Sequence, residues 1–348
     1  MPEAQLLIPF ALPPADHAKD LLSALRTPVL AQMLARASAG RHQDSDPFAA
    51  ALPHERWLSG DGAPFSPQLK GDTSPALAHM LMQQLGQNVD EGLWFLLQPA
   101  HLHIARDHLV LTDLRELHIS EQESRALFDA ALPLFEELGY SLRYGDACHW
   151  FLRADQWKNL RTCTPDAACG HNVDVWLPTG DTERDWRRLH NEVQMLWHTH
   201  AVNDHRDEQS RPRINALWLW AASEAISTHA GMAQLAALQT GHALQAQPAD
   251  NQLRLRDTSF KDQHLINTRL IHTSLIAPAL SSDWSSWLSA MQALDETLLA
   301  AQLYALKSGQ LNKLSLILSD GARLREWHIS RNSMRKFWCR ASLARLGA

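Results

Sequence analysis

Apolar residues recur every three or four positions over several long segments, which places them on one face of an α-helix. The segments predicted to be helical are 16–37, 74–85, 120–139, 181–200, 232–244 and 284–306. The helix at 120–139 begins with a capping box, in which Ser120 precedes Glu123 by three residues. The clearest helix is 181–200, whose apolar stripe runs from Trp186 to Trp197. Such helices need a sheet or other helices to cover their apolar faces.

Shorter apolar runs, bounded by turn residues, predict β-strands. They lie at 6–10, 92–112, 140–152, 213–220, 311–318 and 322–329. The run at 213–220 is apolar on both faces, which favours a buried central strand. Because helices and strands alternate through the second half of the chain, we expect an α/β or α+β fold with a mixed sheet and flanking helices.

The first part of the chain has a different pattern. Residues 40–74 are rich in Gly, Pro, Asp and Ser without a sustained period, which is typical of a long irregular connection. We therefore predict an N-terminal region, 1–88, made of a strand, helices and this connection. The remainder, 89–348, is predicted to be a mixed α/β domain that ends in a hairpin and a basic tail.

Composition and charge exclude several classes of protein. The 348 residues are 45% apolar, which is too high a share for a disordered chain, and they carry a formal net charge of −6, which disfavours a nucleic-acid partner. No run approaches 18 apolar residues, so no membrane span is expected. The N-terminus lacks the basic and apolar regions of a secretory signal, and the four cysteines form no CxxC pair. We expect a cytoplasmic protein with reduced thiols.

Polar residues of the segment 187–215 are the first candidates for a ligand site. Arg187, Asn191 and His198 fall on one face of the helix at 181–200, where a cation, an amide and an imidazole could hold an anionic oxygen ligand. The alternative is a solvated polar face. Arg206 follows in the loop after this helix, and Asn215 lies within the apolar strand. A buried Asn needs hydrogen-bond partners, so Asn215 either fixes a neighbouring loop or faces a ligand.

A metal site is the second candidate. His101 and His103 are two residues apart on a predicted strand and therefore share a face. Imidazoles in this arrangement suit a divalent metal such as Mn or Zn. The alternative is an exposed strand face in a chain that holds 19 His residues.

The segment 200–218 carries a resemblance. Its string H-x-V-N-x-x-R-x5-P-x-x-N-x-L-W contains His200, Asn203, Arg206 and Asn215, and it resembles a signature of archaeal-type cofactor-independent phosphoglycerate mutases. From about residue 90 onward the chain resembles a group of bacterial proteins called RpfE-type regulatory proteins, often labelled as phosphoglycerate mutases. The supporting phrases are QPAHLHIARDHLVLTD at 98–113, GHNVDVWLPTG at 170–180, NEVQMLWHTHAVNDHR at 191–206, NALWLW at 215–220 and KFWCR at 336–340.

The mutase resemblance implies two divalent metals, Asp and His ligands from both ends of the chain, and a Ser nucleophile. The chain departs from this pattern. Its first strand runs into Ala-Leu-Pro-Pro instead of an Asp-Gly metal loop, and no Asp-His ligand pair follows the segment 191–223. Ser59-Gly-Asp-Gly62 is a weak substitute in an irregular stretch. A Gly-rich turn after the strand at 213–220 is replaced by Ala221-Ala222-Ser223, whose Cβ atoms fill the space a phosphate would need.

Three functions follow as hypotheses. The leading one is a non-catalytic regulatory or ligand-binding protein that resembles the substrate-side domain of these mutases and binds a small phosphorylated acid. Its candidate binding residues are Arg187, Asn191, His198, Asn203, Arg206 and Asn215. The second is an active metal-dependent phosphoglycerate mutase or phosphohydrolase. The third is a scaffold that binds a protein partner through exposed Trp residues, of which the chain has 13 in all.

Overall fold

The chain folds into two compact units. The computed structural model describes residues 2–60, 73–224, 232–236, 268–336 and 338–347. The first unit combines Met1–Pro47 with Ala237–Ala348, and the second unit is Phe48–Ala236. This division differs from the predicted boundary between residues 88 and 89, because the N-terminal strand pairs with strands from the C-terminal part of the chain.

The first unit is built on a five-stranded mixed sheet in the order β2-β11-β10-β1-β9. Its strands are β1 (Glu3–Ile8), β2 (Ser38–Asp44), β9 (Thr268–Ile271), β10 (Lys313–Ser319) and β11 (Arg323–Ser330). Strand β1 runs parallel to both β10 and β9, whereas β10, β11 and β2 are antiparallel. The hairpin predicted around Asp320 is confirmed, and so is the mixed sheet.

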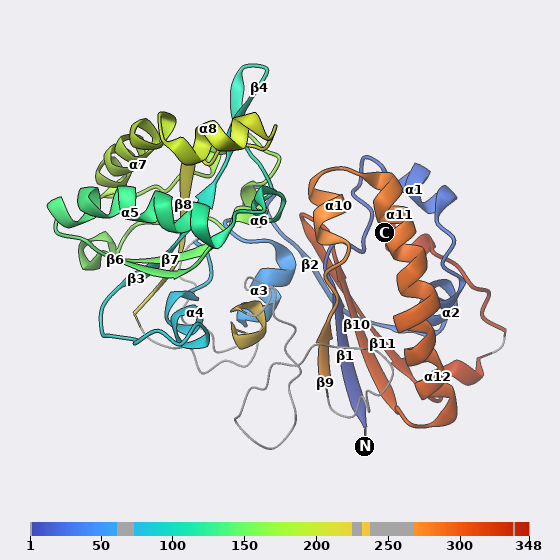
Figure 1. Ribbon diagram of the computed structural model, residues 1–348. Coiled ribbons are helices and arrows are strands. Elements are labelled where there is room, and N and C mark those ends of the chain that lie inside the picture. The colour runs from blue at the N-terminus through green and yellow to red at the C-terminus, as the bar shows by residue number, and fades with distance from the viewer. Residues whose placement is uncertain (1, 61–72, 225–231, 237–267, 337, 348) are drawn as a thin grey trace. The chain divides into compact units, whose positions relative to one another are not determined.

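Helices cover this sheet on the side where Figure 1 shows α11 and α12. They are α1 (Ala18–Ala24), α2 (Pro28–Arg36), α10 (Ile276–Leu280), α11 (Trp284–Leu294), a π-helical turn (Asp295–Leu299), α12 (Ala300–Ser308) and two 3₁₀ turns (Ser333–Arg335, Ala344–Leu346). The single helix predicted at 16–37 is wrong, because the chain breaks before Pro28, which starts a new helix. The carboxylate of Asp295 accepts hydrogen bonds from the backbone N–H groups of Val29 and Leu30 and caps that helix.

The second unit contains a four-stranded antiparallel sheet in the order β6-β7-β3-β8 and a separate two-stranded hairpin, β4-β5. The strands are β3 (Trp94–Ala100), β4 (Leu102–Ala105), β5 (His108–Leu111), β6 (Ser141–Asp146), β7 (His149–Arg153) and β8 (Ala216–Ser223). Strand β8 is buried on both faces, as its sequence predicts. Its predicted central position is wrong, since among the described strands it pairs only with β3.

The helices of the second unit carry most of the polar residues of interest. They are α3 (Pro53–Ser59), α4 (Ala78–Gln84), α5 (Glu121–Glu137), α6 (Pro165–Ala168), α7 (Glu183–His198), α8 (Ala201–Glu208) and 3₁₀ turns at Leu114–Leu117, Asp155–Trp157 and Val173–Val175. Figure 1 shows α5, α7 and α8 side by side, and contacts between α5 and both other helices confirm this. Of the helix predicted at 232–244, residues 232–236 are helical and the rest lies outside the described residues.

The core of the second unit is largely aromatic. Trp150 and Trp197 meet edge to face at 5.8 Å between ring centroids, and Trp157 and Trp186 do so at 6.0 Å. The indole N–H of Trp197 donates to the backbone carbonyl of Leu127, which fixes α7 against α5. No helix in the described part of the chain is long and apolar enough to cross a membrane.

Candidate functional site

An open groove of about 470 Å³ lies between the start of α5 and helix α8. Its lining comes from the first turns of α5, from α8 and from the turn after α8. The lining residues are Ser120, Gln122, Glu123, Ala126, Ala201, Val202, His205, Gln209 and Arg211. The lining combines hydroxyl, amide, imidazole, carboxylate and guanidinium groups with apolar Ala and Val side chains. Such a mixture suits a small polar ligand.

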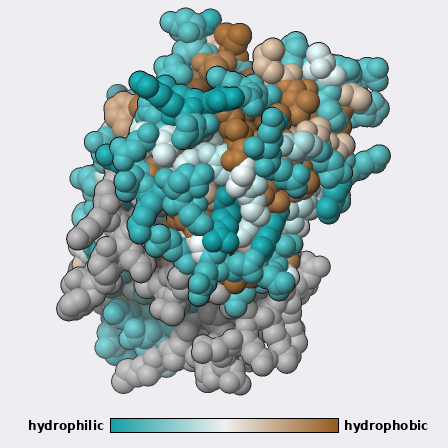
Figure 2. All heavy atoms as spheres, turned by 90° about the vertical axis from the view of Figure 1, so that its left-hand side faces the viewer, coloured by the Kyte–Doolittle hydropathy of each residue, from teal (hydrophilic) through white to brown (hydrophobic). Residues whose placement is uncertain are grey.

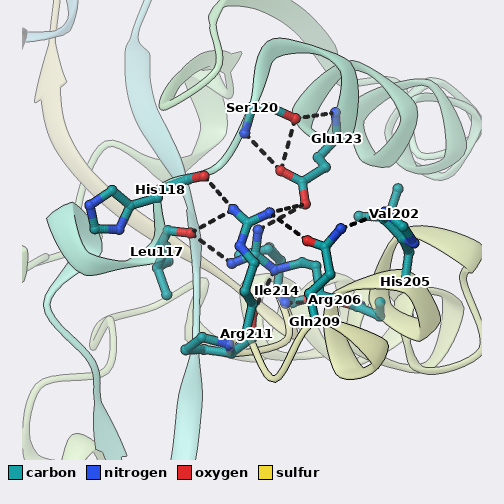
Figure 3. Close-up of polar contacts among 12 residues, drawn as sticks. Leu117, His118, Ser120, Glu123, Val202, His205, Arg206, Gln209, Arg211 and Ile214 are labelled. Carbon is teal, nitrogen blue, oxygen red and sulfur yellow. Dashed lines mark hydrogen bonds and ion pairs between the residues drawn. The ribbon is translucent and has the colours of Figure 1, made fainter.

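The predicted capping box forms the start of α5 and fixes one wall of the groove (Figure 3). The Ser120 hydroxyl accepts the backbone N–H of Glu123 at 3.2 Å. The Glu123 carboxylate in turn accepts the backbone N–H and the hydroxyl of Ser120, both at 2.8 Å. These bonds hold Oε2 of Glu123, so its other oxygen, Oε1, faces α8.

Two arginines meet at this Oε1 atom. Arg206 donates to it through Nη1 at 3.0 Å, and Arg211 does so through Nη1 at 3.1 Å. The Arg206 side chain is fully buried, whereas 31% of the Arg211 side chain is exposed. Arg206 also donates to the backbone carbonyls of Pro212 at 2.6 Å and Leu117 at 2.7 Å. Arg206 is therefore part of the scaffold beneath the groove, and Arg211 is part of its surface.

The charges at this site leave a positive excess. Burial opposes ionisation of Glu123, but hydrogen bonds from Ser120 and Arg206 outweigh it and lower the pKa of the carboxyl. Burial also lowers the pKa of Arg206, and the hydrogen bond to Glu123 counters that effect. One carboxylate thus faces two guanidinium groups. The excess charge is accessible at Arg211, which makes the groove suited to an anion.

Three more residues of the resemblance segment bond backbone groups. Asn203 is fully buried, where its amide donates to the carbonyls of Trp197 and Ile214 and accepts the N–H of Ile214. Asn215 pairs through its side chain with the N–H and the carbonyl of Leu102, at 2.8 Å each. Nδ1 of His200 accepts the N–H of Val202 and caps α8.

These bonds hold α8, the turn after it and the start of β8 together. They favour the structural alternative for Asn215, in which it fixes a neighbouring segment. The prediction that Arg206 lies in a loop is wrong, because residues 201–208 continue as helix α8 once His200 has capped it.

The helix α7 carries the other three candidates as its sequence predicts. Arg187, Asn191 and His198 are all exposed on it. Arg187 lies 3.7 Å from the Glu183 carboxylate one turn earlier. None of the three lines the groove. Their placement matches the solvated polar face that is the alternative to a ligand site.

His101 and His103 lie at and just beyond the junction of β3 and β4. Their rings are nearly parallel, with centroids 6.0 Å apart and 15° between the ring planes. Nδ1 of His101 donates to the carbonyl of Arg213 at 2.7 Å, and Nδ1 of His103 is 3.2 Å from the Thr112 hydroxyl. In the described part of the chain, no group of three or more His, Cys, Asp or Glu residues could hold a metal ion. Residues 61 and 62 of the Ser59–Gly62 alternative lie outside the described residues.

The carboxyl end of β8, where a ligand is expected in an open α/β sheet, is occupied by protein. The backbone N–H of Ala221 donates to the Ser74 hydroxyl at 3.0 Å, and its carbonyl accepts the N–H of Leu77. The Ser223 hydroxyl accepts the backbone N–H of His79 and lies 2.7 Å from Nδ1 of that residue. Segment 74–79 thus covers the position at which sequence reasoning places a ligand.

A second cluster of ionisable groups is buried around α3. The Glu55 carboxyl is 1% exposed and accepts the N–H of Leu52 and the hydroxyl of Thr164 through Oε2, at 2.7 Å each. Its Oε1 has no hydrogen-bond partner among the described residues. Burial, reinforced by the charge of Asp166, raises the pKa of Glu55 to about 8. The Arg115 guanidinium donates two hydrogen bonds to the Asp166 carboxylate and forms a bidentate ion pair with it.

The tryptophans proposed for a scaffold are mostly internal. Trp186, Trp197, Trp218, Trp220 and Trp287 are 4% exposed or less. Figure 2 shows a largely hydrophilic face with apolar side chains gathered in its upper half. The exposed large apolar residues in the second unit are Phe48, Ile104, Leu109, Leu138, Val175, Met195 and Leu196. Apart from Phe48, these residues are aliphatic.

Sequence reasoning missed most of the groove. It identified Ser120 and Glu123 as a helix start, without a role in a site. It passed over His205, Gln209 and Arg211, although each lies within or just beyond the segment that it singled out. The available signal was the spacing of His205 and Gln209 on one helix face, which becomes informative only once residues 201–208 are known to be helical.

No protein-family model and no curated protein matches this chain. The solved structures that are similar to it include the following two. One is a cofactor-independent phosphoglycerate mutase from Thermoplasma acidophilum DSM 1728, with 14% identity and a TM-score of 0.41 over 100% of this chain and 95% of that chain. The other is the PH0037 protein from Pyrococcus horikoshii, with 11% identity and a TM-score of 0.44 over 94% and 87%. Neither similarity assigns an activity to this chain.

Proposed function

We propose that the chain is a non-catalytic binding protein of regulatory type that recognises a small phosphorylated acid in the groove between α5 and α8. The observation that carries this proposal is the Arg211 side chain, which lines the groove and is 31% exposed. It stands beside a carboxylate that is already neutralised by the buried Arg206. An anion that enters the groove therefore meets a net positive charge.

The remaining lining supplies the other contacts that such a ligand needs. The amides of Gln122 and Gln209 are neutral groups for hydroxyl and phosphate oxygens. His205 is exposed and lies 2.8 Å from the Gln209 side chain, so the two act as one polar edge. Ala126, Ala201 and Val202 face the carbon skeleton of the ligand. The choice of a phosphorylated acid also draws on the sequence resemblance of residues 200–218 to the mutase signature.

The test is a calorimetric titration of the purified protein with 3-phosphoglycerate. We expect saturable binding by the wild type and loss of binding in Arg211→Ala. The matched control is Arg188→Ala, which removes an exposed arginine of α7 that pairs with the nearby Glu192. Binding that survives in Arg211→Ala, or absence of binding in the wild type, contradicts the proposal.

A coupled assay for the interconversion of 3- and 2-phosphoglycerate, with Mn²⁺ and with a chelator, distinguishes this function from the active-enzyme hypothesis. We expect no turnover in either condition. Metal-dependent turnover at ordinary enzyme rates identifies an active mutase instead and overturns the non-catalytic assignment.

A further inference from the structure

We propose that His101 and His103 form a surface binding site for one borderline divalent cation, of which Zn²⁺ is the reference case. The site lies on the face of the β4-β5 hairpin and shares no residue with the groove lining. It therefore stands or fails independently of the proposed function. It also differs from the two-metal arrangement of Asp and His ligands that the mutase resemblance implies.

The backbone brings the two imidazoles together. Residues two apart in an extended segment point to the same side, so His101 and His103 share one face of the hairpin. Thr112 faces them from the opposite strand, since its N–H donates to the carbonyl of His101 and His103 pairs with Val110. The ring centroids are 6.0 Å apart and the ring planes are within 15° of parallel. Because His101 is held by Arg213, a shared ion requires the exposed His103 side chain to turn so that its Nε2 approaches that of His101.

The hydrogen bond of His101 prepares it as a ligand. A carbonyl oxygen only accepts, so Nδ1 of His101 must carry the proton in its 2.7 Å bond to Arg213. The lone pair is then on Nε2. A backbone carbonyl that fixes the tautomer in this way is the usual outer-shell partner of a metal-binding histidine.

His103 lies on the exposed side, beside a hydroxyl that can accept the Nδ1 proton or donate to Nδ1. Its Nδ1 lies 3.2 Å from the Thr112 hydroxyl, and the described residues offer no partner to its Nε2. Two imidazole nitrogens select Zn²⁺, Ni²⁺ or Cu²⁺ over Mg²⁺ or Ca²⁺, which prefer oxygen ligands. Since the described residues supply no third His, Cys, Asp or Glu ligand, water fills the remaining positions.

The experiment is a calorimetric titration of the untagged protein with Zn²⁺ at pH 7.5. Because the chain has 19 His residues, specificity is judged against His42→Ala, which removes an exposed strand histidine from the first unit. We expect one binding event in the wild type and in His42→Ala, and its loss in both His103→Ala and His101→Gln. Thr112→Val is expected to weaken binding by about tenfold, because it removes the partner of His103.

A second readout does not depend on affinity alone. Electron paramagnetic resonance of bound Cu²⁺ should show coupling to imidazole nitrogen in the wild type and not in His103→Ala. His103 is exposed, so this variant is expected to keep its fold, which circular dichroism checks. Unchanged Zn²⁺ binding in His103→Ala, or only weak binding at many sites in the wild type, overturns the proposal.

Discussion

Arg206 and Arg211 donate to the same carboxylate oxygen of Glu123, yet they belong to different parts of the molecule. Arg206 is fully buried, and its nitrogens also donate to the carbonyls of Pro212, after α8, and Leu117, before α5. Arg211 reaches the carbonyls of Leu117 and His118 but keeps 31% of its side chain in solvent. The same chemical group is thus buried in the scaffold at one position and partly exposed to solvent five residues later.

The comparison extends to the resemblance segment. His200, Asn203, Arg206 and Asn215 bond backbone groups, and the last three hold α8, the following turn and β8 in place. A resemblance in these residues therefore describes a local fold. Residues that contact a ligand must be sought among their exposed neighbours.

The largest effect is expected from Arg206→Met. It leaves the carbonyls of Pro212 and Leu117 and one side of Glu123 without their donor, so the free energy of unfolding should fall by about 3–5 kcal/mol. Urea unfolding of Arg206→Met and Arg188→Met measures it, and the second variant is expected to change little. A loss below about 1 kcal/mol for Arg206→Met would place this arginine outside the scaffold.

Glu55 is a second carboxyl, and its pKa is shifted in the opposite direction to that of Glu123. Glu55 accepts its hydrogen bonds from neutral donors next to the charged Asp166, and burial raises its pKa from near 4.5 to about 8. The folded state binds this proton more tightly than the unfolded state. The contribution of Glu55 to the free energy of unfolding is therefore fully present below pH 4.5 and is lost as the pH rises through 8.

Glu55→Gln mimics the protonated carboxyl and should remove this pH dependence. We expect its stability relative to the wild type to rise by a few kcal/mol between pH 5 and pH 8.5, since one pKa unit corresponds to about 1.4 kcal/mol. Asp166, Arg115 and His54 remain in place in both proteins. Thermal unfolding across this range provides the measurement, and parallel curves for the two proteins would contradict the raised pKa.

Two asparagines from the predicted ligand set provide a matched pair. Asn203→Ala removes three hydrogen bonds from buried backbone groups and should cost about 1–3 kcal/mol. Asn191→Ala, on the exposed face of α7, should cost less than about 0.5 kcal/mol. Chemical denaturation of both variants tests the difference. Equal costs would remove the distinction between scaffold and surface.

Only a small effect on stability is expected from Arg211→Ala. Its ion pair with Glu123 is partly exposed, so the loss should be about 0–1 kcal/mol. The same variant is expected to abolish stabilisation by 3-phosphoglycerate in a thermal shift assay. A large loss of stability without ligand would assign Arg211 to the scaffold, together with Arg206.

Local patterns predicted most of the elements. The capping box at Ser120, the hairpin around Asp320 and the helix that ends before Gly309 depend on neighbouring residues, and the structure confirms them. The pairing of β1 with β10 joins residues about 310 positions apart, and no local pattern encodes it. The position of β8 at the end of the strand order was equally inaccessible, because burial on both faces does not reveal how many strands adjoin it.

The site was predictable only in part. A conspicuous Arg or Asn within an apolar segment marks a polar group that needs partners, but the sequence does not show whether those partners are backbone or ligand. The side chains of Arg206 and Asn203 donate hydrogen bonds to backbone carbonyls. No pattern in the sequence around Arg211 marks it as a site residue. Only the fold brings it beside Glu123 and the start of α5.

The most direct test of the central claim is a two-dimensional ¹⁵N–¹H nuclear magnetic resonance titration with 3-phosphoglycerate. We expect the largest shift changes at the backbone amides of Ser120–Glu123 and of residues 205–211, together with the side-chain signals of Arg211. Changes confined to α7 around Asn191 and His198, to the carboxyl end of β8, or to the first unit would contradict the account, as would a spectrum that the ligand leaves unchanged.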